Sequence, residues 1–406
     1  MKIQRCKGMR DMSPAEMAVF HAIKGICRDC FTKWGYREVR TPTIEYLHLF
    51  TSAGTLTPTM LGKVYSFLDW DGWSGERVVL RPDGTIPVAR LYTESMSGQG
   101  LARLFYAANM FTFETGEKDR ERWQCGAELI GAGSAVADAE LIALSAEIVS
   151  KLGLKGVELQ LSHAGLIKAL LAKLKVPSEE QHRLFDSILD GDAAVLAKVR
   201  REIPQLGEAL LPLLSVKGQS VDFLSNQRAL LLQTMPEIGS SLDDFLKTVA
   251  ILDDLGIKYQ INIASGAGRE YYTGMIFQLF MGKEKIGGGG RYDALISSMG
   301  GGDVPASGFA VYLDRLIKLV KPNAVLPTAT KRILVKGNVE EIFKVADALR
   351  RAGYIAELDL DGREAAYILE VKSATLLTLM DKAKSKKTDA RSVEEIIKLL
   401  EAKGAV

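Results

Sequence analysis

The sequence has few residues of the types that build disulfide frameworks and metal sites. Four cysteines and four histidines are scattered through 406 residues, which is too few and too dispersed for a disulfide scaffold. Cys27 and Cys30 form one C-x-x-C pair, but no second pair and no nearby C-x-x-H completes a zinc site. Apolar residues at helical spacing surround them, which favours packing on a helix face over a redox or metal pair. We therefore expect no metal centre and no cofactor.

Long apolar runs and an excess of one charge are also absent. No apolar stretch approaches the roughly 18 to 20 residues that span a bilayer, and the first residues lack the hydrophobic core of a signal peptide. The expected location is cytoplasmic. The 52 basic and 50 acidic residues leave a net charge of +2, so neither a membrane nor a nucleic acid is an expected partner.

The order of the predicted elements indicates an α+β fold. Ser13, Pro14 and Glu16 form a helix-start signature for a helix over 14–34. Leucine and alanine at helical spacing predict a helical insertion over about 163–256. The remaining elements are a hairpin over 64–81, a helix over 84–94, strands over 101–114 and 122–133, a helix over 138–152, strands over 258–264, 274–280 and 284–290, and a helix near 308–320. The hairpin-like links predict an antiparallel sheet flanked by helices.

A linker divides the chain near its C-terminal end. Residues 321–331 contain two prolines and little apolar pattern, so we expect one domain over 1–325 and a small α/β domain over 326–406. The elements expected in the small domain are a strand over 332–337, a helix over 339–353, strands over 354–362 and 365–372, and a final helix over 392–403. At this size the domain lies near the lower end of what folds independently.

Two short segments place polar groups where a ligand could bind. In "LRPDGT", Asp83 and Thr85 stand at a strand-to-helix transition, where they either cap the helix or offer a carboxylate and a hydroxyl to a ligand ammonium. In "QCGAELIG", Gln124, Gly126 and Glu128 share one face of a strand. Two polar side chains and a glycine on one face suit either solvent or a polar ligand.

The run "GGGGRYDAL" over 287–295 lets a backbone approach something closely, because glycine has no Cβ. A phosphate cradle on a sheet and tight strand packing are both compatible with it. The chain has no Walker A loop and no G-x-G-x-x-G at a strand-to-helix turn. The glycines alone therefore do not choose between these two interpretations.

Six separated motifs together resemble one protein family. "KGMRDMSP", "LRPDGT", "QCGAELIG", "YYTGMIF", "GGGGRYDAL" and "SGFAVYLDRL" occur in the order found in histidyl-tRNA synthetases and, especially, in their paralogues, the regulatory subunits of ATP phosphoribosyltransferase. The resemblance covers roughly residues 6 to 320. It implies a class II aminoacyl-tRNA synthetase-like antiparallel sheet flanked by helices, a helical insertion and a dimeric assembly.

The resemblance also implies a histidine pocket. It places Asp83, Thr85 and Gln124 around the amino group, and Glu128 and Tyr272 around the imidazole, where a carboxylate and a phenol can bond the ring nitrogens. The synthetases more commonly carry glutamate at the position of Asp83, which favours the paralogue. The rest of the implied lining comprises Tyr271, Gly288, Gly289 and Gly290.

Departures from the family pattern concern the phosphate-binding arginines. Thr112 stands where motif 2 has an arginine, and Ala267 stands where the histidine-specific motif has its catalytic arginine. Each lost cationic contact typically costs about 10² to 10³ in rate. Arg120 and Arg315 remain as candidates for residual nucleotide binding, and Arg269 is a candidate to replace the arginine missing at Ala267.

These departures, together with a C-terminal region that lacks part of the synthetase's anticodon-binding domain, imply a chain without catalytic residues. The resemblance then implies a regulatory subunit that joins a short-form ATP phosphoribosyltransferase catalytic subunit for the first step of histidine biosynthesis. A homodimer within a hetero-oligomer, and feedback regulation by histidine, are expected with it. The alternatives are a divergent histidyl-tRNA synthetase and a protein that binds tRNA-like structures.

Overall fold

The computed structural model describes residues 4–52, 61–70, 75–98, 100–114, 118–172, 236–262, 271–326 and 331–401, together with a few positions between 194 and 233. The chain divides into two compact units, Met1–Val325 and Leu326–Val406. No helix among the described residues is both long and apolar enough to cross a membrane.

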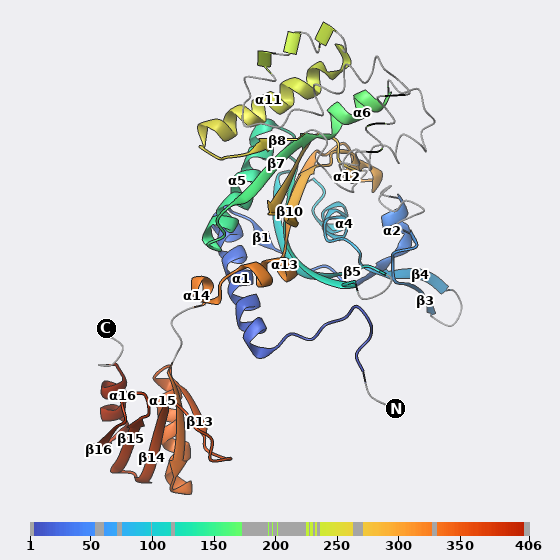
Figure 1. The fold of residues 1–406 in the computed structure, drawn as a ribbon. Coiled ribbons are helices and arrows are strands. Elements are labelled where there is room, and N and C mark those ends of the chain that lie inside the picture. The colour runs from blue at the N-terminus through green and yellow to red at the C-terminus, as the bar shows by residue number, and fades with distance from the viewer. Residues whose placement is uncertain are drawn as a thin grey trace. The chain divides into compact units, whose positions relative to one another are not determined.

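The first unit is built on an eight-stranded sheet (Figure 1). In spatial order its strands are β1 (Arg37–Glu38), β5 (Ala102–Phe111), β6 (Glu121–Ile130), β11 (Ala306–Tyr312), β10 (Glu284–Arg291), β9 (Met275–Met281), β7 (Val157–His163) and β8 (Gln260–Ile261). The strands from β5 to β7 pair antiparallel. The edge strands β1 and β8 pair parallel with β5 and β7. The predicted antiparallel sheet and α+β class are thus confirmed.

Helices cover both faces of this sheet, as Figure 1 shows. One face carries α1 (Pro14–Lys33), α5 (Ala135–Lys151) and α13 (Leu313–Leu319), and the other carries α4 (Thr85–Ser95) and α12 (Ala294–Ser298). Phe31 of α1 packs against Phe105 of β5 and Phe309 of β11, with ring centroids 5.0 and 6.0 Å apart. The remaining described helices of this unit are α2 (Leu47–Ser52), α6 (Ala164–Ala172), the 3₁₀ turn η1 (Pro236–Ile238), α11 (Gly239–Asp254) and α14 (Pro322–Val325).

Helix α1 begins where the sequence predicts. Ser13 accepts a hydrogen bond from the Glu16 backbone N–H at 3.3 Å, and Glu16 accepts one from the Ser13 backbone N–H at 2.8 Å. This reciprocal capping box satisfies two backbone donors that a helix otherwise leaves unpaired. Cys27 and Cys30 lie on the buried face of α1 with no exposed surface.

The helix predicted near 308–320 is only partly correct. Residues 308–312 belong to β11, which hydrogen-bonds to β6 on one side and β10 on the other. Most of β11 is buried on both faces, so its apolar residues do not alternate with polar ones, and periodicity cannot distinguish such a strand from a helix. The helical part is α13 alone.

A second, three-stranded sheet completes the first unit. Its strands are β2 (Ile44–Tyr46), β4 (Gly75–Leu80) and β3 (Ser66–Trp70), in that spatial order and all antiparallel. The pair β3 and β4 forms the predicted hairpin, whose tip lies outside the described residues. The segment Ala267 to Arg269 and most of the predicted insertion also lie outside them, while the described ends of the insertion include helices α6 and α11.

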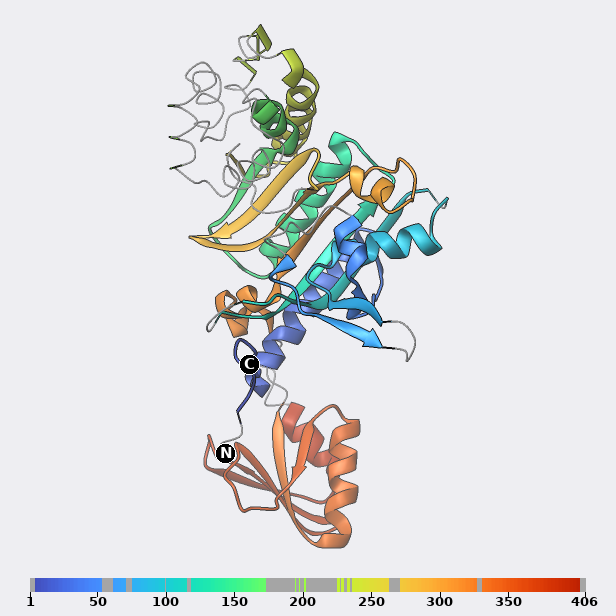
Figure 2. The ribbon, with the colours of Figure 1, turned by 90° about the vertical axis from the view of Figure 1, so that its right-hand side faces the viewer.

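The second unit has a five-stranded sheet with two helices on one face (Figure 2). In spatial order the strands are β13 (Ile355–Leu358), β12 (Arg332–Gly337), β14 (Tyr367–Ser373), β15 (Leu376–Asp381) and β16 (Lys386–Ala390). Helices α15 (Val339–Arg351) and α16 (Val393–Glu401) bury Leu349 and Leu400 in a core with Val335, Leu369 and Leu379. The sequence predicted neither β15 nor β16. The residues of β16 are almost all polar or charged, and the apolar residues of β15 do not alternate regularly with polar ones.

Candidate functional site

A cavity of about 210 Å³ opens on the sheet face that carries α4. It is lined by seven residues of the predicted pocket: Asp83, Thr85, Gln124, Tyr271, Tyr272, Gly288 and Gly289. The other lining residues are Tyr106, Ile276, Phe277, Gln278, Lys285, Tyr292, Gly308, Phe309, Ala310 and Tyr312. Residues from distant parts of the sequence therefore meet in one concave, largely polar site.

The turn before α4 brings Asp83 and Thr85 to the cavity. Arg81 is buried and donates to the backbone carbonyls of Asn109 and Thr41 at 2.8 and 2.9 Å, which fixes this turn against β5. Asp83 Oδ1 accepts a hydrogen bond from the Ile86 backbone N–H at 2.9 Å. Asp83 thus pairs one backbone N–H of the first turn of α4, although the residue at the N-cap position is Gly84, and the same side chain also lines the cavity.

Glu128 lies immediately behind the cavity wall, fully buried. Its Oε1 accepts a hydrogen bond from Thr85 Oγ1 at 2.8 Å, and its Oε2 accepts one from the Tyr292 hydroxyl. Burial raises the pKa of Glu128 to about 8, although both hydrogen bonds oppose this shift. Thr85 and Tyr292 line the cavity, so Glu128 holds two hydroxyl groups of the cavity wall.

Glycine makes room for the Glu128 carboxylate. Gly308 of β11 stands directly opposite Glu128 in the sheet register. A Cβ at Gly308 would lie 1.8 Å from Glu128 Oε2, far inside van der Waals contact. The carboxylate therefore occupies the space that a side chain at position 308 would need.

Tyrosines supply much of the aromatic lining of the site. Tyr271 packs against Tyr272 and Tyr292, with ring centroids 5.1 and 5.6 Å apart. Tyr106 of β5 lies over Gly84 and Gly126, where added Cβ atoms would approach its ring to 2.4 and 2.5 Å. Burial raises the pKa of Tyr106 and of Tyr292 well above the usual value, so both remain neutral hydroxyls at physiological pH.

Tyr106 and Tyr292 were not predicted from the sequence as residues of the site. The signal for Tyr106 was present indirectly, in the glycines that its ring covers. For Tyr292 the signal was the tyrosine that follows the glycine run. Without the strand register, neither signal shows which residues Tyr106 and Tyr292 contact.

The glycine run lies in β10, where tight packing explains it. Added Cβ atoms at Gly288 and Gly289 would lie 2.7 and 2.1 Å from backbone carbonyl oxygens of the neighbouring strands. Gly290 lies beneath Tyr272, whose ring would be 2.9 Å from its Cβ. Gly288 and Gly289 also line the cavity. The absence of a side chain at these positions therefore permits both the close packing of the strands and the open floor of the cavity.

Comparisons with known proteins agree with this geometry. The family model for histidyl-tRNA synthetase matches residues 8–316. The chain belongs to the histidyl-tRNA synthetase family. Within that family it groups with the ATP phosphoribosyltransferase regulatory subunits: a protein so named from Dehalococcoides mccartyi is 49% identical over 98% of both chains. A histidine–tRNA ligase from Methanocaldococcus jannaschii is 33% identical, with coverage of 90% of this chain and 88% of its own.

Solved structures support the same class II fold. An ATP phosphoribosyltransferase regulatory subunit/histidyl-tRNA synthetase from Bacillus halodurans superimposes with a TM-score of 0.76 at 26% identity, covering 90% of this chain and 95% of its own. A histidyl-tRNA synthetase from Nostoc sp. PCC 7120 superimposes with a TM-score of 0.79 over 99% of this chain and 100% of its own. At 19% identity the latter shows the fold alone.

Arg120 and Arg315, the two arginines predicted for residual nucleotide binding, are not among the described residues that line the cavity. The Arg120 guanidinium lies over the Phe113 ring, 4.8 Å from its centroid, and donates to the Tyr65 hydroxyl at 3.3 Å. Arg315 pairs with Glu284 at 2.8 Å. Thr112 contributes a backbone hydrogen bond to the Arg120 carbonyl, and Ala267 and Arg269 lie outside the described residues.

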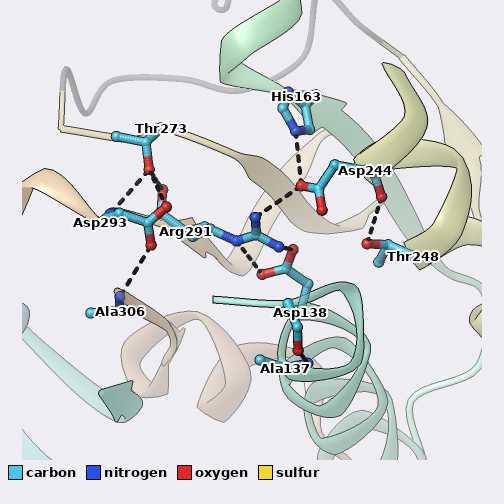
Figure 3. A network of polar contacts seen from close by, with 10 residues as sticks. Ala137, Asp138, His163, Asp244, Thr248, Thr273, Arg291, Asp293 and Ala306 are labelled. Carbon is cyan, nitrogen blue, oxygen red and sulfur yellow. Dashed lines mark hydrogen bonds and ion pairs between the residues drawn. The ribbon is translucent and has the colours of Figure 1, made fainter. Parts of the chain in front are cut away.

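Figure 3 shows an ionic network that connects β10 with α5 and α11. Arg291 of β10 pairs with Asp138 of α5 and with Asp244 of α11, the latter at 2.9 Å. Asp244 also contacts His163 Nε2 at 3.4 Å. Burial raises the pKa of Asp138 to about 7, although Arg291 opposes this shift. Because Arg291 immediately precedes Tyr292, the network fixes one wall of the cavity to α5 and to the base of the insertion.

No cluster of potential metal ligands occurs among the described residues. The charged groups of the cavity wall, within the described ranges, are the Asp83 carboxylate and the Lys285 ammonium. Lys285 was not predicted from the sequence as a residue of the site.

Proposed function

We propose that this chain is a non-catalytic regulatory subunit of ATP phosphoribosyltransferase, which catalyses the first step of L-histidine biosynthesis. We propose further that its cavity binds histidine. The 49% identity to regulatory subunits over nearly the full length of both chains supports the first part. The match between the cavity lining and the family's histidine pocket supports the second.

One observation carries the non-catalytic assignment. The cavity is lined by the residues that we propose bind the amino acid, whereas Thr112 stands at one arginine position and Arg315 is paired with Glu284. Adenylation develops negative charge on phosphate, and preorganised cations usually stabilise it. Since each lost contact costs about 10² to 10³ in rate, a site without them binds the amino acid but activates it very slowly.

The proposed binding mode follows the chemistry of the wall. Asp83 and Gln124 receive the ammonium, because a carboxylate and an amide oxygen are its natural acceptors. Tyr271 and Tyr272 flank the imidazole. Glu128 holds the hydroxyls of Thr85 and Tyr292 in place, so that the ring nitrogens meet fixed polar partners.

The regulatory role depends on a partner. We propose a cytoplasmic assembly in which a homodimer of this chain joins short-form catalytic subunits and senses histidine for feedback inhibition. Histidine bound here and catalysis in another chain would be linked by a coupling free energy, typically about 1 to 3 kcal/mol.

Three measurements test the proposed function. Isothermal titration calorimetry should detect histidine binding to the purified chain, and the chain should raise the activity of a short-form catalytic subunit. Histidine-dependent ATP–pyrophosphate exchange by the chain alone should be negligible. Robust exchange would refute the non-catalytic assignment.

The alternative is a divergent histidyl-tRNA synthetase, which the 33% identity to histidine–tRNA ligases favours. This alternative requires that a cation from another part of the chain replace the motif 2 arginine, whose position Thr112 occupies. Charging of tRNA with histidine by the purified chain would establish this alternative.

A further inference from the structure

Lys285 lines the cavity, although the regular alternation of side chains along a strand does not predict this. It lies in β10, three positions before Gly288, so regular alternation would place it on the opposite face of the sheet. The register shows otherwise. Gln278 pairs with Gly288, and Phe280 pairs with Lys285, because the pairing shifts between Lys285 and Gly287.

This irregularity turns Lys285 to the cavity side. Gln278 and Phe280 are two residues apart on β9 and so share a face, and directly paired residues on adjacent strands share a face as well. Lys285 therefore lies on the face of Gln278 and Gly288, both of which line the cavity. A bulge that re-aims a side chain next to a functional site is a recurring device in sheets.

The side chain of Lys285 lies next to Gly288 in the floor of the cavity. Its Cε lies 3.5 Å from the point where a Cβ on Gly288 would stand, and Lys285 itself lines the cavity. Lys285 forms no ion pair or side-chain hydrogen bond with any residue that the structure describes. A half-buried ammonium with no protein partner there is available to a ligand anion.

The charges of the wall complement a zwitterion. Among the described lining residues, Asp83 carries the negative charge and Lys285 the positive charge, and they belong to different elements, the turn before α4 and strand β10. An α-amino acid presents one ammonium and one carboxylate. Asp83 accounts for the ammonium, and a cation is required for the carboxylate.

We propose that Lys285 binds the α-carboxylate of the amino acid and thereby selects amino acids over their esters and amines. This inference rests on the proposed histidine site. Lys285 would then hold the carboxylate in the ground state, which is one part of the role for which Arg269 is the candidate from the sequence. Binding of a carboxylate by the single Lys285 ammonium does not require the arginines that a synthetase uses for adenylation.

The test compares two ligands on four proteins by titration calorimetry. The ligands are L-histidine and L-histidine methyl ester, which keeps the ammonium and imidazole but has no carboxylate charge. The proteins are the wild type, Lys285→Met, Lys285→Arg and the control Lys283→Met. Lys283 is an exposed residue of the β9–β10 turn and does not line the cavity as the described residues define it.

Lys285→Met should weaken histidine binding by about 10- to 100-fold, the usual range for a charge-assisted hydrogen bond. Its affinity for the ester should change by less than about threefold, a difference that a merely structural role of Lys285 would not produce. Lys285→Arg should restore most of the preference for histidine, and Lys283→Met should behave as the wild type.

Two results would overturn the inference in distinguishable ways. If the wild type binds histidine and Lys285→Met binds it equally well, or loses both ligands equally, the carboxylate is held elsewhere while the histidine site stands. If the wild type binds neither ligand, the proposed histidine site itself is wrong.

Discussion

The protonation of Glu128 offers a direct test of how the site is built. Its carboxyl group is fully buried, and its pKa is raised by burial from the usual 4.5 to about 8. Between these two pH values the folded protein retains a proton that the unfolded chain has released. Stability should therefore fall as the pH rises through this window and then become constant above pH 8.

The expected magnitude follows from the width of the window. A span of roughly 3.5 pH units between 4.5 and about 8 corresponds to about 5 kcal/mol at about 1.4 kcal/mol per unit. Glu128→Gln removes the titration. Near pH 5 the Glu128→Gln variant should have a free energy of unfolding about 1 kcal/mol below that of the wild type, because an amide offers one acceptor oxygen to the two hydroxyls. Above pH 8 the variant should be more stable than the wild type.

Urea unfolding at pH 5.5, 7.0 and 8.5 measures this effect. All four tryptophans lie within residues 1–325, so their fluorescence reports the unit that contains Glu128. Glu158→Gln, at an exposed position of β7, provides the control and should follow the wild type at each pH. A difference between wild type and Glu128→Gln that stays constant with pH would refute the reasoning.

Three further predictions concern packing, binding and the buried ions. Gly308→Ala should destabilise the first unit by about 3 kcal/mol or more in urea unfolding, because its Cβ would lie 1.8 Å from Glu128 Oε2, whereas Gly25→Ala in the open part of α1 should stabilise it by about 0.5 to 1 kcal/mol. Tyr272→Phe should weaken histidine binding by roughly 1 to 3 kcal/mol in calorimetry, and unchanged affinity would mean that the phenol does not contact the ligand. Arg291→Met should cost about 3 to 5 kcal/mol, because it leaves Asp138 buried without its partner, and adding Asp138→Leu should recover part of that loss; no recovery would contradict the ion-pair explanation.

The local elements were predictable because their signals are local. The capping box at Ser13 and Glu16 starts α1, and the polar residues on one face of β6 indicate a functional surface. β11 was missed in part, since a strand buried on both faces has the same apolar run as a buried helix. β15 was missed because its apolar residues do not alternate regularly with polar ones, and β16 was missed because pairing with β15, rather than an apolar pattern, makes it a strand.

The sequence alone determined the family, the class of fold and seven of the seventeen residues that line the cavity, because motifs, caps and alternation depend on neighbouring residues. Only the tertiary structure decided how these residues act. Glu128 lies behind Thr85 and Tyr292, Arg315 is paired with Glu284, and a shift in strand register turns Lys285 towards the cavity. Each of these facts depends on which strands are neighbours and in what register, and that is fixed by packing across the whole sheet.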